Sequence, residues 1–410
     1  MMPTMTETPV SSGVGSTPGE ILELVRSGQA TTRTDLRRLT GLSRTAVVAR
    51  VSALVDAGLL LLGEELASTG GRPPGALIFN GDAGVVLAVA IGRSRSQLAI
   101  FDLEGRELTG DTRDHEVGVS AQELMPQVVE RLRKMLDGVH PPVIGIGMSL
   151  PGVVDSARLV SVDSPVMGGW DGVELAPYFA ELTDAPVLLA NDADTLATSE
   201  LFGPGAHPRN ALVLKASTGL GLGLVVDGKV RRGAWGAAGE IGHSPIEAAA
   251  GVACRCGNTG CLEAIAGGWA LVNRLVASGV EAGHVRDLVA SALAGDAVAR
   301  ASLRESGRYV GEVLAIAINM LNPETVVIGG DMGQAFDLYT AGVRESVYAR
   351  STALATRDLS FVPATHGDSS GLVGCAAIAI EHALHAANVD AYLADRGADA
   401  AGAVPPAIAD

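Results

Sequence analysis

The sequence predicts an α/β protein in which a small, mostly helical N-terminal head precedes a larger body of two similar lobes. From Gly84 onward, short apolar runs bounded by glycine and polar residues alternate with stretches of helical periodicity. The order strand, strand, strand, helix that begins at Val85 begins again at Ala211. This repetition predicts an internal duplication with a cleft between the two lobes.

Length and composition limit the class of protein. A chain of 410 residues with 47% hydrophobic and 19% charged residues is globular and long enough for two or three domains. No apolar run reaches the length of a membrane span, and the N-terminus lacks the pattern of a signal peptide. Three of the four cysteines are clustered, which favours a metal site in a reducing compartment over disulfides. We therefore expect a cytoplasmic protein without a membrane partner.

The domain boundaries follow from changes in composition. We expect residues 1–17 to be disordered, 18–80 to form the head, and 81–390 to form the body. Within the body, lobe one comprises about residues 81–205 and a C-terminal helix over 371–388, and lobe two about 206–370. The segment Ala386–Asp410 is rich in Ala and Asp and ends near two prolines, which predicts a disordered tail, assigned to 391–410.

Charge is distributed unevenly between head and body. The net charge of −16 argues against a nucleic-acid binder over its whole surface. Residues 18–80, however, carry seven arginines and six acidic residues, a net charge of +1, and Glu7 is the only charged residue before them. A protein with an acidic body and such a head can still bind DNA, because the local charge of the head, and not the total charge of the chain, interacts with the phosphates.

The head contains three expected helices and two expected strands. Each helix is bounded by capping residues: Thr32 or Thr34 before the second, Ser43 before the third, and glycine after each. The expected elements are helices over Pro18–Ser27, Thr34–Thr40 and Arg44–Ala57, a tight turn at Gly41-Leu42, and strands over Leu59–Leu62 and Gly75–Phe79.

This order is typical of a winged helix-turn-helix domain. On the third helix Val47, Val51, Leu54 and Val55 form the inward stripe. The residues left facing outward, which we predict to contact DNA, are Ser43, Arg44, Thr45 and Arg50, with Arg72 at the tip of the wing. The alternative is a small helical packing domain with ordinary surface arginines.

The body is expected to alternate strands and helices. Expected strands are Val85–Ile91, Leu98–Leu103, one near Glu107, Val143–Ser149, Val187–Ala190, Ala211–Lys215, Gly223–Val226, Lys229–Arg232 and Thr325–Ile328. Expected helices are Ala121–Leu136, Val173–Leu182 and one from Asp192. Asp192 follows a strand and begins a helix, so its carboxylate would either act as a general base in the cleft or cap the helix. A glycine-rich turn over 218–223 is suited to close approach of a phosphate or sugar, but alone is a weak signal.

A cysteine cluster lies between Gly239 and Glu263. Cys254, Cys256 and Cys261 fall within eight residues, with His243 upstream and the carboxylates Glu240 and Glu263 flanking the group. Three thiolates and one imidazole are a standard ligand set for structural zinc. The alternative is three reduced cysteines in a surface loop.

Together these residues resemble the ROK family of bacterial sugar kinases and related repressors with an N-terminal winged helix. The resemblance covers about Pro18 to Leu384 and rests on motifs in order: IGIGMSLPGVVD (144–155), LLANDAD (188–194), STGLGLGLVVDG (217–228), GAAGEIGH (236–243), CRCGNTGCLE (254–263) and NPETVVIGG (322–330). It implies an actin-like ATPase fold, also called ribonuclease H-like, for the body.

The resemblance also implies roles for individual residues. It implies zinc ligands at His243, Cys254, Cys256 and Cys261, and a sugar-binding set of Asn191, Asp192, Glu240, His243 and Glu263. Asp192 would be the base if the protein is a kinase. The nucleotide-binding positions, which could be vestigial, are Gly92, Ser94, Thr218, Gly219, Gly221 and Gly330.

One departure from the family pattern bears on function. The kinases open with Asp-x-Gly-x-Thr, where this chain has Ala90-Ile91-Gly92-Arg93-Ser94. Loss of the aspartate removes an anchor for the magnesium that serves phosphoryl transfer. We therefore expect a sugar-responsive regulator, a repressor of carbohydrate-metabolism genes, that binds operator DNA as a homodimer or tetramer and holds zinc. The alternatives are an ATP- and Mg-dependent hexose or N-acetylhexosamine kinase with an accessory DNA-binding head, and a dimerisation scaffold without an effector.

Overall fold

The computed structural model describes residues 17–65, 75–162, 167–203, 207–279 and 282–402. The chain divides into two compact units. Unit one contains Met1–Gly84, Asp102–Glu104 and Ile380–Asp410, and unit two contains Val85–Phe101 and Gly105–Ala379. The boundary at Ile380 falls inside the C-terminal segment that we expected to belong to lobe one.

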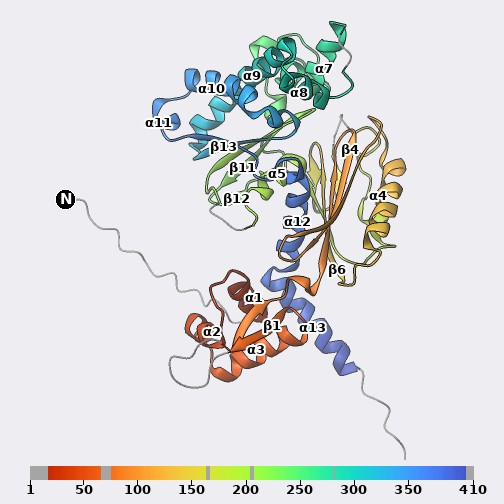
Figure 1. The fold of residues 1–410 in the computed structure, drawn as a ribbon, viewed down its shortest axis with the longest axis vertical. Coiled ribbons are helices and arrows are strands. Elements are labelled where there is room, and N and C mark those ends of the chain that lie inside the picture. The colour runs from red at the N-terminus through yellow and green to blue at the C-terminus, as the bar shows by residue number, and fades with distance from the viewer. Residues whose placement is uncertain (1–16, 66–74, 163–166, 204–206, 280–281, 403–410) are drawn as a thin grey trace, which may run out of the picture. The chain divides into compact units, whose positions relative to one another are not determined.

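Unit one begins with three helices and a strand pair (Figure 1). These are α1 (Pro18–Arg26), α2 (Arg33–Thr40), α3 (Arg44–Asp56) and the antiparallel strands β1 (Leu60–Glu65) and β2 (Gly75–Phe79). The side chains of Thr17, Thr32 and Ser43 accept hydrogen bonds from the first turns of their helices, so Thr32 and not Thr34 caps α2. Gly41 has φ 71°, a left-handed conformation that lets α2 end and α3 begin three residues later, at Arg44. The predicted helices and strands of the head are confirmed.

The C-terminal segment corrects one prediction. Residues expected to form a disordered tail instead make α13 (Ala386–Gly402). The helix packs on α1: the backbone N–H of Gly19 donates to Asp390 at 2.8 Å, and Val389 is buried. A Cβ on Gly19 would lie within 2.1 Å of the Ala386 carbonyl oxygen. Alanine has the highest helix propensity, and Val389 anchors the helix by its burial.

Unit two contains two lobes with the same sheet topology. The lobe one sheet has the order β5-β4-β3-β6-β9, and the lobe two sheet β12-β11-β10-β13-β14. In each, an antiparallel meander of three strands is followed by two strands parallel to the first. The predicted duplication is therefore confirmed strand by strand. The lobe one strands are β3 (Val85–Ile91), β4 (Arg95–Asp102), β5 (Glu107–Asp114), β6 (Val143–Leu150) and β9 (Val187–Asn191); those of lobe two are β10 (Ala211–Ala216), β11 (Leu220–Val226), β12 (Lys229–Val230), β13 (Thr325–Gly329) and β14 (Ser360–Pro363).

Helices cover the sheets of both lobes (Figure 1). In lobe one, α4 (Ala121–Leu136) packs on one face, and α12 (Ser370–Ala383) lies so close to β6 on the other that a Cβ on Gly147 would overlap the Cys375 carbonyl. The apolar side chains of α8 to α10 and of the lobe two sheet form a second core. The remaining elements are α5 (Asp192–Ser199), α6 (Glu263–Ala266), α7 (Gly268–Ala277), α8 (Val285–Leu293), α9 (Ala297–Leu321), α10 (Phe336–Arg350), α11 (Ala353–Thr356) and the short pair β7 (Val154–Asp155) and β8 (Val160–Ser161).

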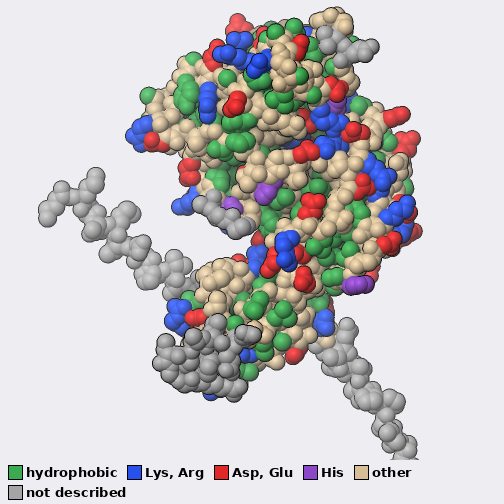
Figure 2. Space-filling model, viewed as in Figure 1, with side chains coloured by type: hydrophobic (Ala, Val, Ile, Leu, Met, Phe, Trp, Pro, Cys, Tyr) green, Lys and Arg blue, Asp and Glu red, His purple; other side chains and the backbone are tan. Residues whose placement is uncertain are grey.

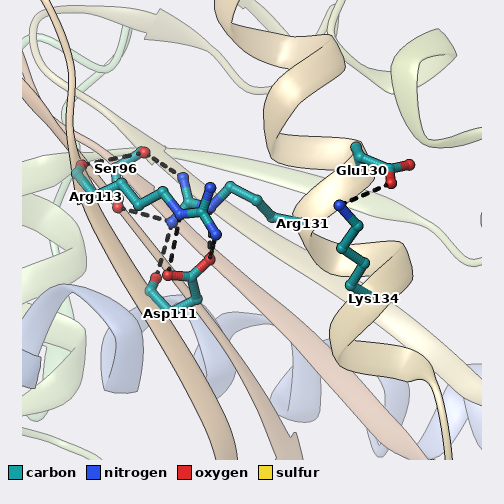
Figure 3. A network of polar contacts seen from close by, with 6 residues as sticks. All are labelled: Ser96, Asp111, Arg113, Glu130, Arg131 and Lys134. Carbon is teal, nitrogen blue, oxygen red and sulfur yellow. Dashed lines mark hydrogen bonds and ion pairs between the residues drawn. The ribbon is translucent and has the colours of Figure 1, made fainter.

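A buried arginine fastens α4 to the meander of lobe one (Figure 3). Arg131 donates from Nε to Asp111 at 2.8 Å and from Nη1 to the Ser96 hydroxyl at 2.6 Å. Its Nη2 donates to the carbonyl oxygens of both residues. Every nitrogen of the guanidinium thus has a partner, which makes the burial of its charge tolerable.

Two expected elements differ in the body. The helix expected over Val173–Leu182 is only a 3-10 turn over Ala176–Phe179, because Pro177 cannot donate the hydrogen bond that a longer helix needs. The glycine-rich turn is shorter than expected, since β11 begins at Leu220. Gly223 lies within that strand, where a Cβ would come within 2.5 Å of Ala197 on α5, so this glycine serves helix–sheet packing.

Among the described residues, no single helix is long and apolar enough to cross a membrane; only the bent pair Gly367–Ala383 and Ala386–Arg396 meets that test when taken together. Basic and acidic side chains are interspersed over the face of unit two shown in Figure 2.

Candidate functional site

The carboxyl ends of the parallel strands open onto one cavity of about 470 Å³ in unit two. The loops that follow β3, β6, β9, β10 and β13 all contribute to its lining. In α/β sheets such strand ends are the usual position of a ligand site. All five predicted sugar-binding residues lie in this lining: Asn191, Asp192, Glu240, His243 and Glu263.

Asn191 and Asp192 occupy the junction between β9 and α5. The Asn191 side chain caps α5, accepting from the N–H groups of Ala193 and Asp194, and donates to the Gly152 carbonyl at 2.8 Å. The alternative in which Asp192 is the cap is therefore wrong. Because its neighbour takes the capping role, the Asp192 carboxylate is free to face the cavity.

Lys215 on β10 is a cavity residue that the sequence analysis missed. Its Nζ lies 2.8 Å from the Asp192 carboxylate. Burial alone would lower the pKa of Lys215, but the carboxylates of Asp192, Asp331 and Glu263 together outweigh burial and the pKa is raised. The signal in the sequence was a single charged residue at the end of the apolar strand ALVLKA. Its ammonium holds the Asp192 carboxylate in place.

Glu240 and Glu263 supply two further carboxyl groups. Burial raises the pKa of Glu240 to about 7, and the carboxylates of Asp192, Glu263 and Asp194 act in the same direction. Glu263 is 4% exposed, and its two oxygens accept from the Leu220 N–H at 3.0 Å and from the Trp269 indole N–H at 3.1 Å. Carboxyl groups of this kind accept hydrogen bonds from neighbouring hydroxyl groups of a ligand, and such sites discriminate strongly between polyols.

His243 and the three cysteines converge beside these carboxylates. Their four ligand atoms lie within 4.8 Å of one another, and the three thiols form no disulfide. His243 Nδ1 is 3.7 Å from Cys254 Sγ, and the sulfurs of Cys256 and Cys261 are also 3.7 Å apart. A tetrahedral ion with metal–sulfur bonds of 2.3 Å requires edges of about 3.8 Å. The residues therefore fit a four-coordinate metal ion.

The imidazole of His243 joins the metal cluster to the cavity. While Nδ1 faces the sulfurs, Nε2 lies 3.9 Å from a carboxylate oxygen of Glu240. A metal bound at Nδ1 would thus leave the other ring nitrogen to orient Glu240 or to meet a ligand.

The residues expected to bind nucleotide also line the cavity, but packing within the protein accounts for several of their glycines. A Cβ on Gly219 would lie 2.8 Å from a Glu263 oxygen, and one on Gly221 would lie 2.9 Å from the Ala193 methyl. Gly330 has φ 81° and abuts Ser217, whose hydroxyl accepts from the Asp331 N–H at 2.9 Å. Gly92, Ser94 and Thr218 complete the set in the lining.

Three of the predicted DNA-contacting residues lie at the start of α3 in unit one, and Arg50 lies in the middle of the helix. Ser43 caps the helix, and Arg44 and Thr45 beside it are exposed. Arg50 is half-buried and donates to the Ala46 carbonyl at 3.2 Å. Val47, Val51 and Leu54 are buried as expected. Arg72 lies outside the described residues.

Comparisons with known proteins match both the body alone and the body together with the head. The family model described as "ROK family" matches residues 86–382. A xylose repressor from Bacillus spizizenii is 26% identical over 375 residues, spanning 89% of this chain and 94% of the relative. A solved ROK family transcriptional regulator, described as a homolog of the E. coli MLC protein, matches with a TM-score of 0.77 and 26% identity over 92% of this chain and 98% of its own. A ROK family glucokinase from Streptomyces griseus, solved with glucose and AMPPNP, matches with a TM-score of 0.61 and 26% identity over 72% of this chain and 99% of its own.

Proposed function

The chain belongs to the ROK family, and we propose that it is a transcriptional repressor that senses a sugar or sugar derivative. The observation that carries the proposal is the extent of similarity. The xylose repressor and the solved regulator match this chain over about nine-tenths of its length, whereas the whole glucokinase matches only 72%. The part of this chain that the regulators match and the glucokinase does not includes the head. This chain therefore has the domain organisation of the regulators in the family.

In this proposal the head is a winged helix-turn-helix domain. α2 and α3 form the two-helix motif around the turn at Gly41, and β1 and β2 form the base of the wing. The exposed start of α3 would enter the major groove, where Ser43, Arg44 and Thr45 would meet base edges or phosphates. Arg50 and Arg72 would contact phosphates or the adjacent groove. Such domains bind paired half-sites, so we propose a homodimer or a tetramer on operator DNA.

The effector would bind in the cavity of unit two. Lys215 holds the carboxyl group of Asp192 and Trp269 that of Glu263, while Glu240 lies 3.9 Å from His243 Nε2. These three carboxyl groups would accept or exchange hydrogen bonds with sugar hydroxyls. Asn191 would contribute its remaining amide hydrogen and His243 its Nε2. Closure of the lobes around the sugar would favour one state of the dimer and so change its affinity for DNA.

We propose zinc for the cluster of His243, Cys254, Cys256 and Cys261. Four protein ligands would fill a tetrahedral shell and leave no open position, so the metal would fix the loop between Gly239 and Glu263 without taking part in chemistry. The two glutamates of that loop would owe their orientation to it.

A sugar kinase is the second candidate, because Asp192 lies in the cavity as a kinase base must. One observation counts against it: Ala90 stands where the kinases of the family have the aspartate that anchors the metal ion. ATP and magnesium would be cofactors only under this alternative.

The experiment measures DNA binding and sugar response together. Genomic fragments selected by the full chain are titrated by fluorescence anisotropy, with and without a panel of sugars, and ATP consumption is followed in parallel. We expect Arg44→Ala to weaken DNA binding about tenfold or more, since contacts to base edges contribute about 1–3 kcal/mol each. Arg209→Ala, which removes the same charge from an exposed position of unit two, is the matched control.

Two results would contradict the proposal. If Arg44→Ala binds DNA with the same affinity as the parent, α3 is not the recognition helix. Sugar-dependent ATP consumption that is abolished in Asp192→Asn would favour the kinase.

A further inference from the structure

Trp269 differs from the other two tryptophans of the chain in what its indole N–H contacts. Trp170 is buried in the core of lobe one and donates to the Val119 carbonyl at 2.9 Å. Trp235 is 88% exposed, in the segment between β12 and the metal cluster. Trp269 is half-buried, lines the cavity, and donates from Nε1 to a carboxylate oxygen of Glu263 at 3.1 Å. Of these three indoles, all in described parts of the chain, only that of Trp269 bonds to a residue of the proposed sugar site.

The backbone of Trp269 is held against the loop after β10. Its N–H donates to the Thr218 carbonyl at 3.1 Å, and the N–H of Gly268 donates to the Ser217 carbonyl at 3.0 Å. A Cβ on Gly268 would lie 2.5 Å from that same Ser217 carbonyl oxygen, so the start of α7 fits closely onto the loop. The indole therefore extends from a backbone that is fixed at the edge of the cavity.

The face of the Trp269 ring is covered by Arg255. The guanidinium carbon of Arg255 lies 4.1 Å from the ring centroid, a distance at which a cation is attracted to an aromatic face. Arg255 stands between Cys254 and Cys256, two of the proposed metal ligands. The loop that carries the cysteines thus packs on the indole that contacts Glu263, and this contact restricts rotation of the ring.

The Glu263 carboxylate is held at both of its oxygens. One accepts from the Leu220 N–H at 3.0 Å and the other from the Trp269 indole. A carboxylate oxygen accepts about two hydrogen bonds, so each oxygen keeps the capacity for a ligand hydroxyl. Without the indole donor the carboxylate would have a single anchor and would be free to rotate about it.

We propose that Trp269 is a positioning residue that directs the Glu263 carboxylate at a hydroxyl group of the sugar effector. The inference rests on the proposed sugar-sensing function and adds to it the group that sets the direction of one acceptor. Because a hydrogen bond weakens steeply as its angle departs from linearity, the affinity for the sugar depends on this orientation. Arg255 supports the ring, which gives the loop of the cysteines a part in sugar recognition.

The test is calorimetric titration of the full chain with D-xylose, D-glucose and N-acetyl-D-glucosamine, and then with the monodeoxy analogues of the probe that binds most tightly. Trp269→Phe keeps an aromatic ring beside Arg255 and removes the N–H donor. We expect it to weaken binding of that probe about fivefold or more, because hydrogen bonds to charged groups are stronger than neutral ones. Trp235→Phe removes an indole N–H from an exposed position and should bind as the parent.

Two further measurements separate positioning from a general structural role. For the monodeoxy analogue that lacks the hydroxyl bonded to Glu263, Trp269→Phe should bind as tightly as the parent does. In the Glu263→Gln background the change at Trp269 should reduce affinity less than about twofold, because residues that act through one another are not additive. Elemental analysis should give Trp269→Phe the metal content of the parent.

The opposing outcomes are distinct. Parent-like binding of the sugar by Trp269→Phe, an equal loss for every deoxy analogue, or losses that multiply with Glu263→Gln would overturn the inference. A parent that releases DNA in the presence of a sugar, together with any of these results, would leave the proposed repressor function intact and refute only the role of Trp269. A parent that binds none of the three probes would overturn the inference and count against sugar sensing as well.

Discussion

Two arginines of lobe one, both close to the start of β4, differ in how their nitrogens are satisfied. Arg131 on α4 has a partner for every nitrogen, supplied by Ser96 and Asp111 of the neighbouring strands. Arg93 on the turn between β3 and β4 has two buried nitrogens and no acceptor for either. The contacts of Arg131 are complete, so it fastens a helix to a sheet. Those of Arg93 are incomplete, so these two nitrogens fasten no neighbouring element. We therefore expect substitution of Arg131 to lower the stability of the fold more than substitution of Arg93.

The largest effect is expected at the proposed metal site. Cys261→Ser removes one of the four proposed ligands, and metal binding to such sites contributes several kcal/mol to folding. We expect loss of the metal and a decrease of more than about 4 kcal/mol in the free energy of unfolding of the metal-loaded protein. Elemental analysis and denaturant unfolding measure both. Cys375→Ala is the matched control: that thiol is buried on α12, outside the cluster, and should leave the metal content unchanged. Metal retained by Cys261→Ser would contradict the assignment.

Arg131→Met tests the satisfied half of the comparison. The change leaves Asp111 and the Ser96 hydroxyl without their donor, so we expect a loss of about 2–3 kcal/mol, below the range for fully buried pairs because Asp111 is partly exposed. Arg133→Met, on the solvent side of the same helix, removes only exposed pairs with Glu130 and Glu181 and should change little. Equal unfolding free energies for the two variants in urea would show that the Arg131 network does not hold α4.

The sequence predicted most of the fold because its signals were local. Strand and helix bounds in unit two, and the caps Thr32 and Ser43, followed from periodicity and capping residues that act over a few positions. Repetition of the meander order was sufficient to predict two lobes of one topology.

What the sequence did not predict depends on contacts between distant segments. The pairing of Lys215 with Asp192 joins strand β10 to the start of helix α5. The lack of acceptors for Nε and Nη1 of Arg93 among the described residues is visible only when its neighbours are placed. The helix α13 was missed because its alanine-rich composition also suits a disordered tail, and only packing on α1 distinguishes the two. In the metal cluster the ligand types were apparent, whereas the direction of the two His243 nitrogens required the structure.

Asp194 is a buried carboxyl group with one ion-pair partner, Arg232, and it gives a pH-dependent prediction. Burial raises the pKa of Asp194 to about 6, although Arg232 at 3.4 Å acts against it and Asp192 acts with it. A carboxyl group with a raised folded-state pKa contributes stability that is fully present below the unfolded-state value of 3.8 and is lost as the pH rises through about 6. That difference in pKa corresponds to about 3 kcal/mol.

Asp194→Asn should therefore be more stable than the parent above pH 6, by about 1–3 kcal/mol. The two proteins should have similar unfolding free energies near pH 4. Urea titrations at both pH values measure the difference. A gain of equal size at the two pH values would show that packing, and not the buried charge, is responsible.

The smallest effect on stability is expected for Arg93, in contrast to the loss expected for Arg131→Met. Arg93→Gln removes a buried charge that has no hydrogen-bonding partner on Nε or Nη1, so the folded protein loses no contact there and is relieved of a desolvated cation. We expect the unfolding free energy without ligand to stay within about 0.5 kcal/mol of the parent or to rise. A loss comparable to that of Arg131→Met without ligand would mean that Arg93 is a structural residue after all, and that its donors find acceptors within the chain.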